Sequence, residues 1–277
     1  MKNILIIGTG SIALQHYRNL VKLEKKNQMK FNFFFHSKSI SRGKDIEKNL
    51  DYKIKHLEEK EIQNYQFSKV IIATSISEHF KWIKYFSYKK CLIFCEKPLV
   101  CKKQELVWLK KNKLRLKDKL LVGFQSRFNP IITKIKEEIK SKKNGKLFTL
   151  DFMCGQNIKE WRPGTDYKKE FAYGKMSKNK KSVVWELCHD LDLAIFFLGK
   201  PLSIYGYEKK LSNLKIKAKD YAEIKLNYNE VIANISLNMF SPALYRNIRI
   251  IFSNKILDAN LVDNILKEIK KKEIKKK

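Results

Sequence analysis

The sequence has no long apolar run and no paired cysteines. No stretch of its 277 residues approaches the roughly 18 consecutive apolar residues that a membrane-spanning helix requires. The apolar start, MKNILIIGTG, is broken by glycines too early for a signal peptide. The five cysteines form no CxxC pair and no zinc-like group with histidine, so neither a disulfide nor a metal site is expected. We therefore expect a cytoplasmic protein that does not contact membranes.

Arginine is scarce among the basic residues, although the formal net charge is +31. A nucleic-acid interface usually gathers arginines and stacking aromatics in one stripe. Here the lysines are spread along the whole chain, and only the tail KEIKKKEIKKK is a true run. We interpret this tail as the solvated end of a lysine-rich helix. A specific nucleic-acid partner is therefore not expected.

Short apolar runs alternate with amphipathic segments in the first half of the chain. The strand candidates are residues 4–8, 31–35, 69–74, 91–95 and 119–124. Apolar residues at helical spacing mark 11–24, 39–49, 77–89 and 102–113 between them. A strand followed by a helix, repeated in this way, predicts an α/β fold with a doubly wound parallel sheet.

The pattern changes after Phe124. A helix at about 129–142 and a strand near 146–154 lead into a polar loop, and a helix at about 183–198 follows. The later strand candidates are 202–209, 219–227, 231–239 and 246–252. This pattern predicts a second domain of the α+β class with a mostly antiparallel open sheet. We place the first domain at residues 1–124 and the second at 125–277.

A glycine turn separates the first strand from the first helix. Gly8 permits a tight turn, Gly10 allows a pyrophosphate to approach the backbone, and the small Ala13 lets the helix lie close to the strand. The N–H groups of Ser11 and Ile12 at the helix start would face the phosphates. Such a turn also occurs where no ligand binds, but its position at the start of a strand–helix unit favours a dinucleotide site.

The end of the second strand indicates which dinucleotide binds. NAD sites usually have an acid there that binds the ribose hydroxyls. This chain instead has His36, Ser37, Lys38 and Arg42, which suit a 2′-phosphate. We expect NADP rather than NAD; the alternative interpretation is that these are ordinary loop residues in a lysine-rich chain.

A lysine follows the apolar run 91–95, in the sequence Glu96-Lys97-Pro98. In open α/β sheets, ligands bind at the carboxyl ends of the strands. Lys97 is therefore either a residue of the active site or one of many solvated loop lysines. The motifs around it decide between these two interpretations.

The ordered motifs resemble those of the glucose-fructose oxidoreductase and inositol dehydrogenase family (Gfo/Idh/MocA), over residues 1 to about 260. The glycine turn matches, TSISEH resembles the family's TPxxxH with Ser75 in place of proline, and EKP is intact. The resemblance implies cofactor contacts from Thr74, His79, Glu96 and Lys97. The segments GQNIKEWRPGTDYKK and WELCHDLDLAIFFLGKP are similar to a branch associated with nucleotide sugars and surface polysaccharides.

Two features differ from that branch. Lys180, Lys181 and Ser182 occupy positions where glycines are usual, and the C-terminal part is shorter than is usual in the family. The first difference affects the expected loop near the substrate. The second affects oligomerisation, for which the resemblance implies pairing of the second-domain sheets.

The implied reaction is hydride transfer between a nicotinamide and a secondary hydroxyl or keto group of a sugar or nucleotide sugar. Lys97 is the proposed proton donor or acceptor at the reacting oxygen, and His189 would share that oxygen or relay the proton. Glu186 and His189 are three residues apart in the expected helix 183–198, and Glu186 or Asp190 would orient the histidine.

Most of the candidate substrate contacts lie in the polar loop, which runs from Gly155 to Ser182. A guanidinium can bind a phosphate or a sugar carboxylate through two hydrogen bonds, although a structural ion pair is an equal alternative for Arg162. Packing is the more common role for a tryptophan such as Trp161. The candidates are Arg127, Trp161, Arg162, Asp166, Tyr167 and Asp190.

A dinucleotide-binding protein of the same fold without catalysis is the main alternative. The missing glycines and the short C-terminal part favour it, whereas the presence of both Lys97 and His189 favours an enzyme. A basic nucleic-acid binder is the third possibility, and the dispersed lysines argue against it.

Overall fold

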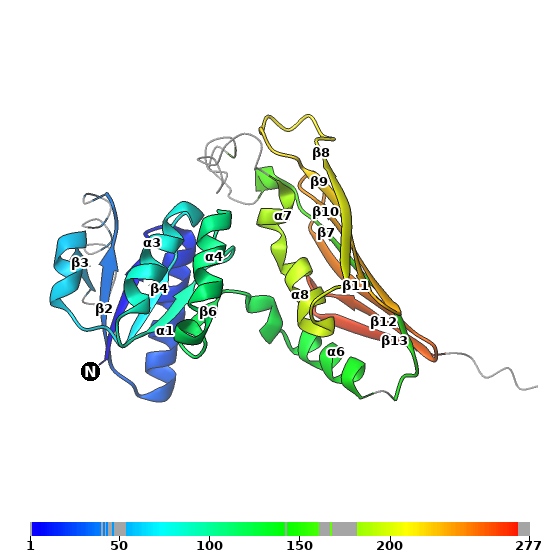
Figure 1. Cartoon of the computed structure of the whole chain (residues 1–277), viewed down its shortest axis with the longest axis horizontal. Helices are drawn as coiled ribbons and strands as arrows, with labels where there is room; N and C mark the ends of the chain where they lie inside the picture. The colour runs from blue at the N-terminus through cyan, green and yellow to red at the C-terminus, as the bar shows by residue number, and fades with distance from the viewer. Residues whose placement is uncertain are drawn as a thin grey trace, which may run out of the picture. The chain divides into compact units, whose positions relative to one another are not determined.

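The computed structural model describes residues 2–39, 41, 43, 46, 54–141, 143–160, 167 and 182–270. The chain divides into two compact units, residues 1–123 and 124–277 (Figure 1). Each unit is built around its own β-sheet. In the part of the chain that is described, no helix is both long and apolar enough to cross a bilayer.

The first unit contains a parallel sheet in the order β3-β2-β1-β4-β5-β6. The strands are β1 (Lys2–Ile7), β2 (Phe31–His36), β3 (Ile54–Leu57), β4 (Lys69–Ile72), β5 (Leu92–Cys95) and β6 (Leu120–Val122). Five of the six were predicted from their apolar runs. The short β3 was not, because Lys55 and His56 interrupt its apolar residues.

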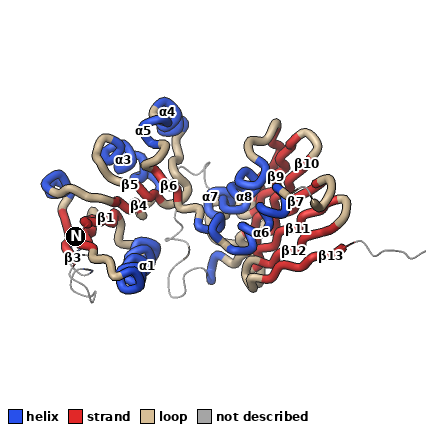
Figure 2. Tube along the Cα trace, turned by 90° about the horizontal axis from the view of Figure 1, so that it is seen from below, coloured by secondary structure: helices blue, strands red, loops and turns tan. Residues whose placement is uncertain are grey.

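Helices lie on both faces of this sheet. They are α1 (Ser11–Asn27), the 3₁₀ helix η1 (Glu59–Asn64), α3 (Ile76–Ser87), α4 (Lys103–Lys111) and α5 (Lys113–Leu116). Helix α1 lies on one face, and α3, α4 and α5 lie on the other (Figure 2). Of the predicted helix 39–49, the described residues 41, 43 and 46 are helical, whereas residue 39 is not.

Strands β1, β2 and β4 of this sheet bury both of their faces, which explains their continuous apolar sequences. Ile4 and Ile6 pack in the cluster that contains Tyr17 of α1, whereas Leu5 and Ile7 pack in the cluster that contains Trp82 of α3. The alternation along β1 therefore directs successive side chains into two separate cores.

The second unit contains a seven-stranded sheet in the order β13-β12-β11-β7-β10-β9-β8. Only β7 and β10 pair in parallel; the other pairs of this described sheet are antiparallel. The strands are β7 (Leu147–Gly155), β8 (Ser203–Lys209), β9 (Tyr221–Tyr228), β10 (Val231–Asn238), β11 (Tyr245–Phe252), β12 (Lys255–Asn260) and β13 (Ile265–Lys270).

The helices of this unit cover one face of its sheet (Figures 1 and 2). They are α6 (Pro130–Lys140), α7 (Val183–Glu186) and α8 (Cys188–Leu198), with the 3₁₀ turns η2 (Gln125–Phe128) and η3 (Ile158–Glu160). Phe152, Ile235 and Ile248 point to the covered face and are almost fully buried. The fold class predicted from the sequence, a doubly wound parallel sheet followed by a mostly antiparallel one, is confirmed.

One predicted helix is interrupted, and the predicted helical tail is wrong. The segment 183–198 forms two helices, because the backbone of Leu187 leaves the helical region (φ −99°, ψ 31°). The lysine-rich tail begins as a strand: β13 pairs antiparallel with β12 through a turn in which Asn264 has φ 56°. Residues 271–277 lie outside the described part of the chain.

Candidate functional site

The glycine turn between β1 and α1 forms a cradle for phosphate. Gly8 has φ +121°, and a Cβ there would lie 2.3 Å from the carbonyl oxygen of Ala73. A Cβ on Gly10 would meet no atom within 4 Å, so the backbone is accessible on that side. Gly10 caps α1 without a side-chain hydrogen bond, and the first turn of α1 contains no acid. These features fit the pyrophosphate of a dinucleotide.

The end of β2 lies against this turn. The N–H of Gly8 donates to the carbonyl oxygen of His36 at 2.9 Å, and the hydroxyls of Thr9 and Ser37 are 3.3 Å apart. His36 is buried, and burial lowers the pKa of its imidazole. Lys38 is exposed and forms an ion pair with Glu78. The sequence did not predict this pair, and Arg42 lies outside the described residues.

The EKP turn follows the carboxyl end of β5, and the Lys97–Pro98 peptide bond is cis. One carboxylate oxygen of Glu96 accepts from the backbone N–H of Lys97 at 3.2 Å. The other lies 2.7 Å from Nε2 of His16 on α1. His16 was not recognised in the sequence, because it lies 80 residues from its partner.

His79 connects the loop after β4 with the EKP turn. It is 1 % exposed, and its Nδ1 and Nε2 lie 3.0 and 3.1 Å from the carbonyl oxygens of Pro98 and Thr74. Burial lowers the pKa of His79, although both carbonyls oppose this effect. A neutral imidazole donates only one N–H, so it donates to one of the two oxygens at a time. Its position therefore supports the loops around Lys97.

In the second unit, the predicted residues lie around the break between α7 and α8. Glu186 ends α7 and His189 is in the first turn of α8, and both are buried. The imidazole of His189 packs edge-to-face on the ring of Phe124, with centroids 5.9 Å apart. The two residues are thus close in the chain but lie on two helices, whereas the sequence predicted a single helix for both.

Asp190 is completely buried and lies 3.3 Å from Nη2 of Arg246 on β11. Burial raises the pKa of this carboxyl, and the guanidinium opposes the rise. Burial and the nearby Asp190 raise the pKa of the Cys154 thiol to about 11, so that the thiol stays protonated. A side chain with no exposed surface is poorly placed to contact a substrate, which was the role expected of Asp190.

Arg127 also has an internal partner. Its Nε and Nη2 donate to the two carboxylate oxygens of Asp192 at 2.7 and 2.5 Å, and its guanidinium lies over the rings of Phe124 and Phe196. Of the other candidate substrate contacts, Tyr167 is described and is half-buried. Trp161, Arg162 and Asp166 lie outside the described residues.

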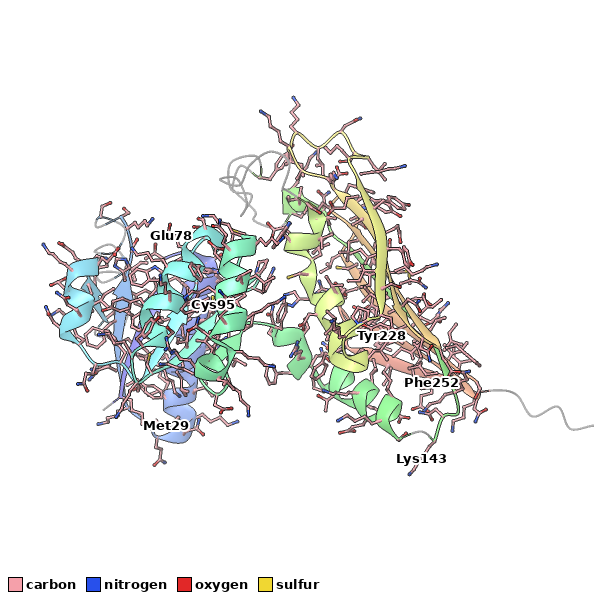
Figure 3. All side chains as sticks on the ribbon, in the orientation of Figure 1. Met29, Glu78, Cys95, Lys143, Tyr228 and Phe252 are labelled. Carbon is pink, nitrogen blue, oxygen red and sulfur yellow. The ribbon has the colours of Figure 1, made fainter. Side chains whose placement is uncertain are left out.

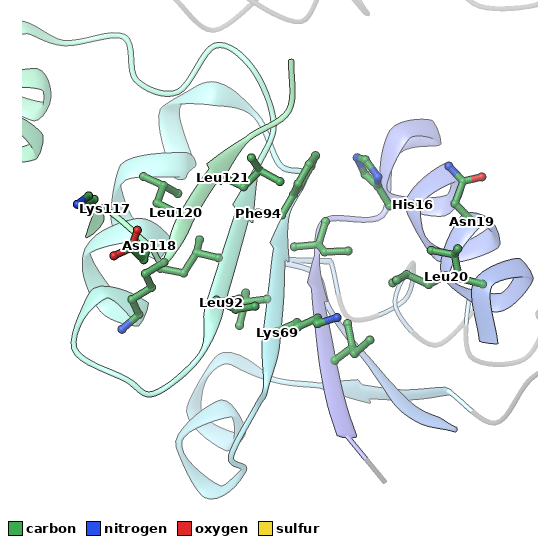
Figure 4. A pocket seen from close by; sticks show the side chains of 16 residues that line it. His16, Asn19, Leu20, Lys69, Leu92, Phe94, Lys117, Asp118, Leu120 and Leu121 are labelled. Carbon is green, nitrogen blue, oxygen red and sulfur yellow. The ribbon is translucent and has the colours of Figure 1, made fainter. Parts of the chain in front are cut away.

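A groove of about 580 Å³ lies elsewhere on the first unit, beside α1 (Figure 4). It is lined by apolar residues of α1, β4, β5 and β6, and extends to Lys69 and Leu92, which begin their strands. The glycine turn and Lys97, in contrast, follow the carboxyl ends of strands. The groove therefore does not mark the ligand site that the strand topology predicts.

The first unit has the strand order and glycine turn of a Rossmann dinucleotide-binding domain. Residues 2–124 match the family GFO_IDH_MocA, an oxidoreductase family with an NAD-binding Rossmann fold. This part of the chain is therefore similar to that family, in agreement with the resemblance that its motifs indicated. No curated protein matches the chain in sequence.

Solved structures of dehydrogenases share the fold of the chain. The WlbA dehydrogenase from Bordetella pertussis, in complex with NADH and UDP-GlcNAcA, has a TM-score of 0.79 at 15% identity, covering 98% of this chain and 78% of its own. A myo-inositol dehydrogenase from Corynebacterium glutamicum has a TM-score of 0.77 at 16% identity, covering 94% and 75%. An NAD binding oxidoreductase from Klebsiella pneumoniae has a TM-score of 0.81 at 15% identity, covering 99% and 77%. At such low identities, the TM-scores show a common fold.

Proposed function

We propose that the chain is an NAD(P)-dependent oxidoreductase that transfers hydride between a nicotinamide cofactor and a secondary hydroxyl or keto group of a sugar or nucleotide sugar. The main support is the position of Lys97, directly after β5 in a Rossmann sheet with an accessible glycine turn. Two dehydrogenases of similar fold add to this support: the WlbA dehydrogenase in complex with UDP-GlcNAcA and the myo-inositol dehydrogenase.

The first unit is the proposed cofactor-binding domain. Gly8, Gly10 and the N–H groups of Ser11 and Ile12 would bind the pyrophosphate, and Ala13 is fully buried against the sheet. NADP is the proposed cofactor, because β2 is followed by Ser37 and Lys38 and not by an acid. The second unit is proposed to bind the substrate and to form a homo-oligomer.

A bound nicotinamide would supply the hydride chemistry, and the protein residues would move the proton. Lys97 would exchange this proton with the hydroxyl or carbonyl oxygen of the substrate. The carboxylate of Glu96 and the ring of His79 fix the backbone on both sides of Lys97. His189 is the second proposed acid–base residue, with Glu186 to orient it. Correctly placed acid–base groups contribute roughly 10²–10⁴-fold to a rate.

A dinucleotide-binding protein without catalysis is the second candidate. Two observations favour it. Arg127 donates its hydrogen bonds to Asp192, and the buried Asp190 forms an ion pair with Arg246. Two of the expected substrate contacts are therefore engaged inside the unit. Such a protein would bind the cofactor but would not transfer hydride to any sugar.

The fluorescence of NADPH and NADH, titrated with the protein, tests cofactor binding. Retention on heparin at physiological salt tests the basic nucleic-acid alternative. Single-turnover hydride transfer with a panel of nucleotide sugars then separates an enzyme from a binding protein. If the cofactor binds but no sugar is oxidised or reduced, the non-catalytic candidate is correct.

For Lys97→Met, we expect hydride transfer to fall by about 10²-fold or more, with cofactor affinity nearly unchanged, because the side chain keeps its bulk but loses its proton. Lys102→Met is the matched control, since Lys102 lies in the same loop and is exposed. Normal transfer by the Lys97→Met variant would show that EKP is only a turn.

A further inference from the structure

Lys38 and Glu78 form an ion pair between the loop after β2 and the first turn of α3. Nζ of Lys38 lies 2.9 Å from Oε2 of Glu78. The lysine side chain is 68% exposed and the glutamate side chain is 24% exposed. The carboxylate is therefore the more firmly placed partner, and Glu78 lies at the upper edge of the first unit in Figure 3.

This pair lies beside the proposed cofactor site. Ser37, which precedes Lys38, contacts Thr9 of the glycine turn, and the preceding His36 accepts from Gly8. In Rossmann domains, the residues at this strand end contact the ribose that carries the 2′-hydroxyl or 2′-phosphate. A carboxylate thus reaches this region from α3, although β2 itself ends without an acid.

We propose that Glu78 determines how strongly the protein prefers NADP over NAD. This inference rests on the proposed function. A 2′-phosphate needs the ammonium of Lys38, which Glu78 already binds, and it would also approach the negative charge of Glu78. NAD lacks this phosphate, so Glu78 weakens the binding of NADP more than that of NAD.

The test measures the dissociation constants of NADPH and NADH for the whole chain by fluorescence titration at low salt. Glu78→Gln should strengthen NADPH binding about threefold to fivefold and change NADH binding by less than about twofold, as expected for an exposed pair. The gain should shrink at high salt, since exposed charges are then screened.

A neighbouring ion pair provides the matched control. Glu59 pairs with Lys81 at 2.5 Å, and both side chains are about half exposed. Glu59→Gln makes the same change in charge but leaves the Lys38–Glu78 ion pair in place. If it raises the NADPH preference as much as Glu78→Gln does, a general change in charge explains the result and the inference is overturned.

A Lys38→Met background tests the coupling directly. In that background, Glu78→Gln should gain at most about twofold in NADPH affinity, because no ammonium remains to be released. If circular dichroism shows that Glu78→Gln is unfolded, Glu78→Ser replaces it in every measurement. If the ratio of the NADPH and NADH dissociation constants is unchanged in the folded Glu78 variant, the role of Glu78 is overturned but the proposed function is not. Failure of the unaltered chain to bind either cofactor overturns the proposed function together with this inference.

Discussion

Gly8 and Gly10 look alike in the sequence, but their backbones and surroundings differ. Gly8 has φ +121°, which side chains rarely adopt, and it lies under the carbonyl of Ala73. Gly10 has φ −77°, and its missing Cβ leaves open space. The first glycine is therefore required for folding, and the second for access to the backbone.

Alanine substitutions should separate these two requirements. Gly8→Ala should lower the free energy of unfolding by about 2–4 kcal/mol, because it combines backbone strain with a clash. Gly10→Ala should change it by less than about 1 kcal/mol but weaken cofactor binding at least about tenfold, because the new methyl group occupies the space for the pyrophosphate. Urea unfolding and NADPH titration measure the two effects. Equal stability losses in both variants would contradict this division.

The contacts of single residues also show which features of the candidate site the sequence does not predict. Lys97, His189 and the glycine turn could be proposed as site residues from the sequence, because each belongs to a local motif, and their roles stay predictions. The partners His16 of Glu96 and Glu78 of Lys38 could not, since 80 and 40 residues separate them and only the folded sheet brings them together. The internal partners of Arg127 and Asp190 were missed for the same reason.

Among the elements, buried parallel strands were the easiest to predict, because both of their faces are apolar. The error at β13 has a physical cause. Ile265 and Ile269 are four residues apart, which suits one face of a helix, but both lie on one face of a strand as well. The hydrogen bonds to β12 stabilise the strand over the helix. Asn264, which adopts a positive φ in the turn before β13, is the local sequence signal for this hairpin.

Two buried histidines, His36 at the end of β2 and His79 on α3, predict how the first unit responds to acid. Burial lowers the pKa of His36 and His79 from the usual 6.5, so the unfolded chain binds more protons than the folded one just below that pH. Stability from these residues is therefore complete above about pH 6.5 and is lost as the pH falls toward their lowered values.

The measurement is the melting temperature between pH 7 and pH 5. It should fall as the pH decreases, and the double variant His36→Gln, His79→Gln should show a smaller fall, although its melting temperature at pH 7 is lower. The carboxyls whose pKa is lowered, such as Glu59 and Glu138, titrate below this range. An equal fall in the double variant would remove the histidines as the cause.

At the scale of the whole molecule, the face of the second sheet that its helices leave uncovered is the candidate interface with another chain. The strand register places Ile232, Ile251, Ile256 and Ile269 in one row on this face. Beside this row, Asn234 donates to Asp151 at 2.6 Å. None of the described helices of this unit covers the row (Figure 2). Thr149 of β7 lies between Ile232 and Ile251, so it is the polar member of this row. A mostly apolar row with satisfied polar neighbours is typical of an interface between protein chains.

We predict that the chain forms a dimer through this face, with a second copy covering the isoleucine row. Each copy has a formal charge of +31, so the copies repel each other and the dimer should become more stable as salt screens the charge. Light scattering at micromolar concentration should give twice the mass of the chain at physiological salt and a lower mass at low salt.

Ile232→Lys together with Ile269→Lys should give the monomer mass, because both substitutions place ammonium groups in the row. Leu114→Lys is the control for added charge, since Leu114 is 90% exposed on α5 of the first unit. A clean monomer for the unaltered chain at physiological salt, or a dimer that survives both lysines, would show that this face is not the interface.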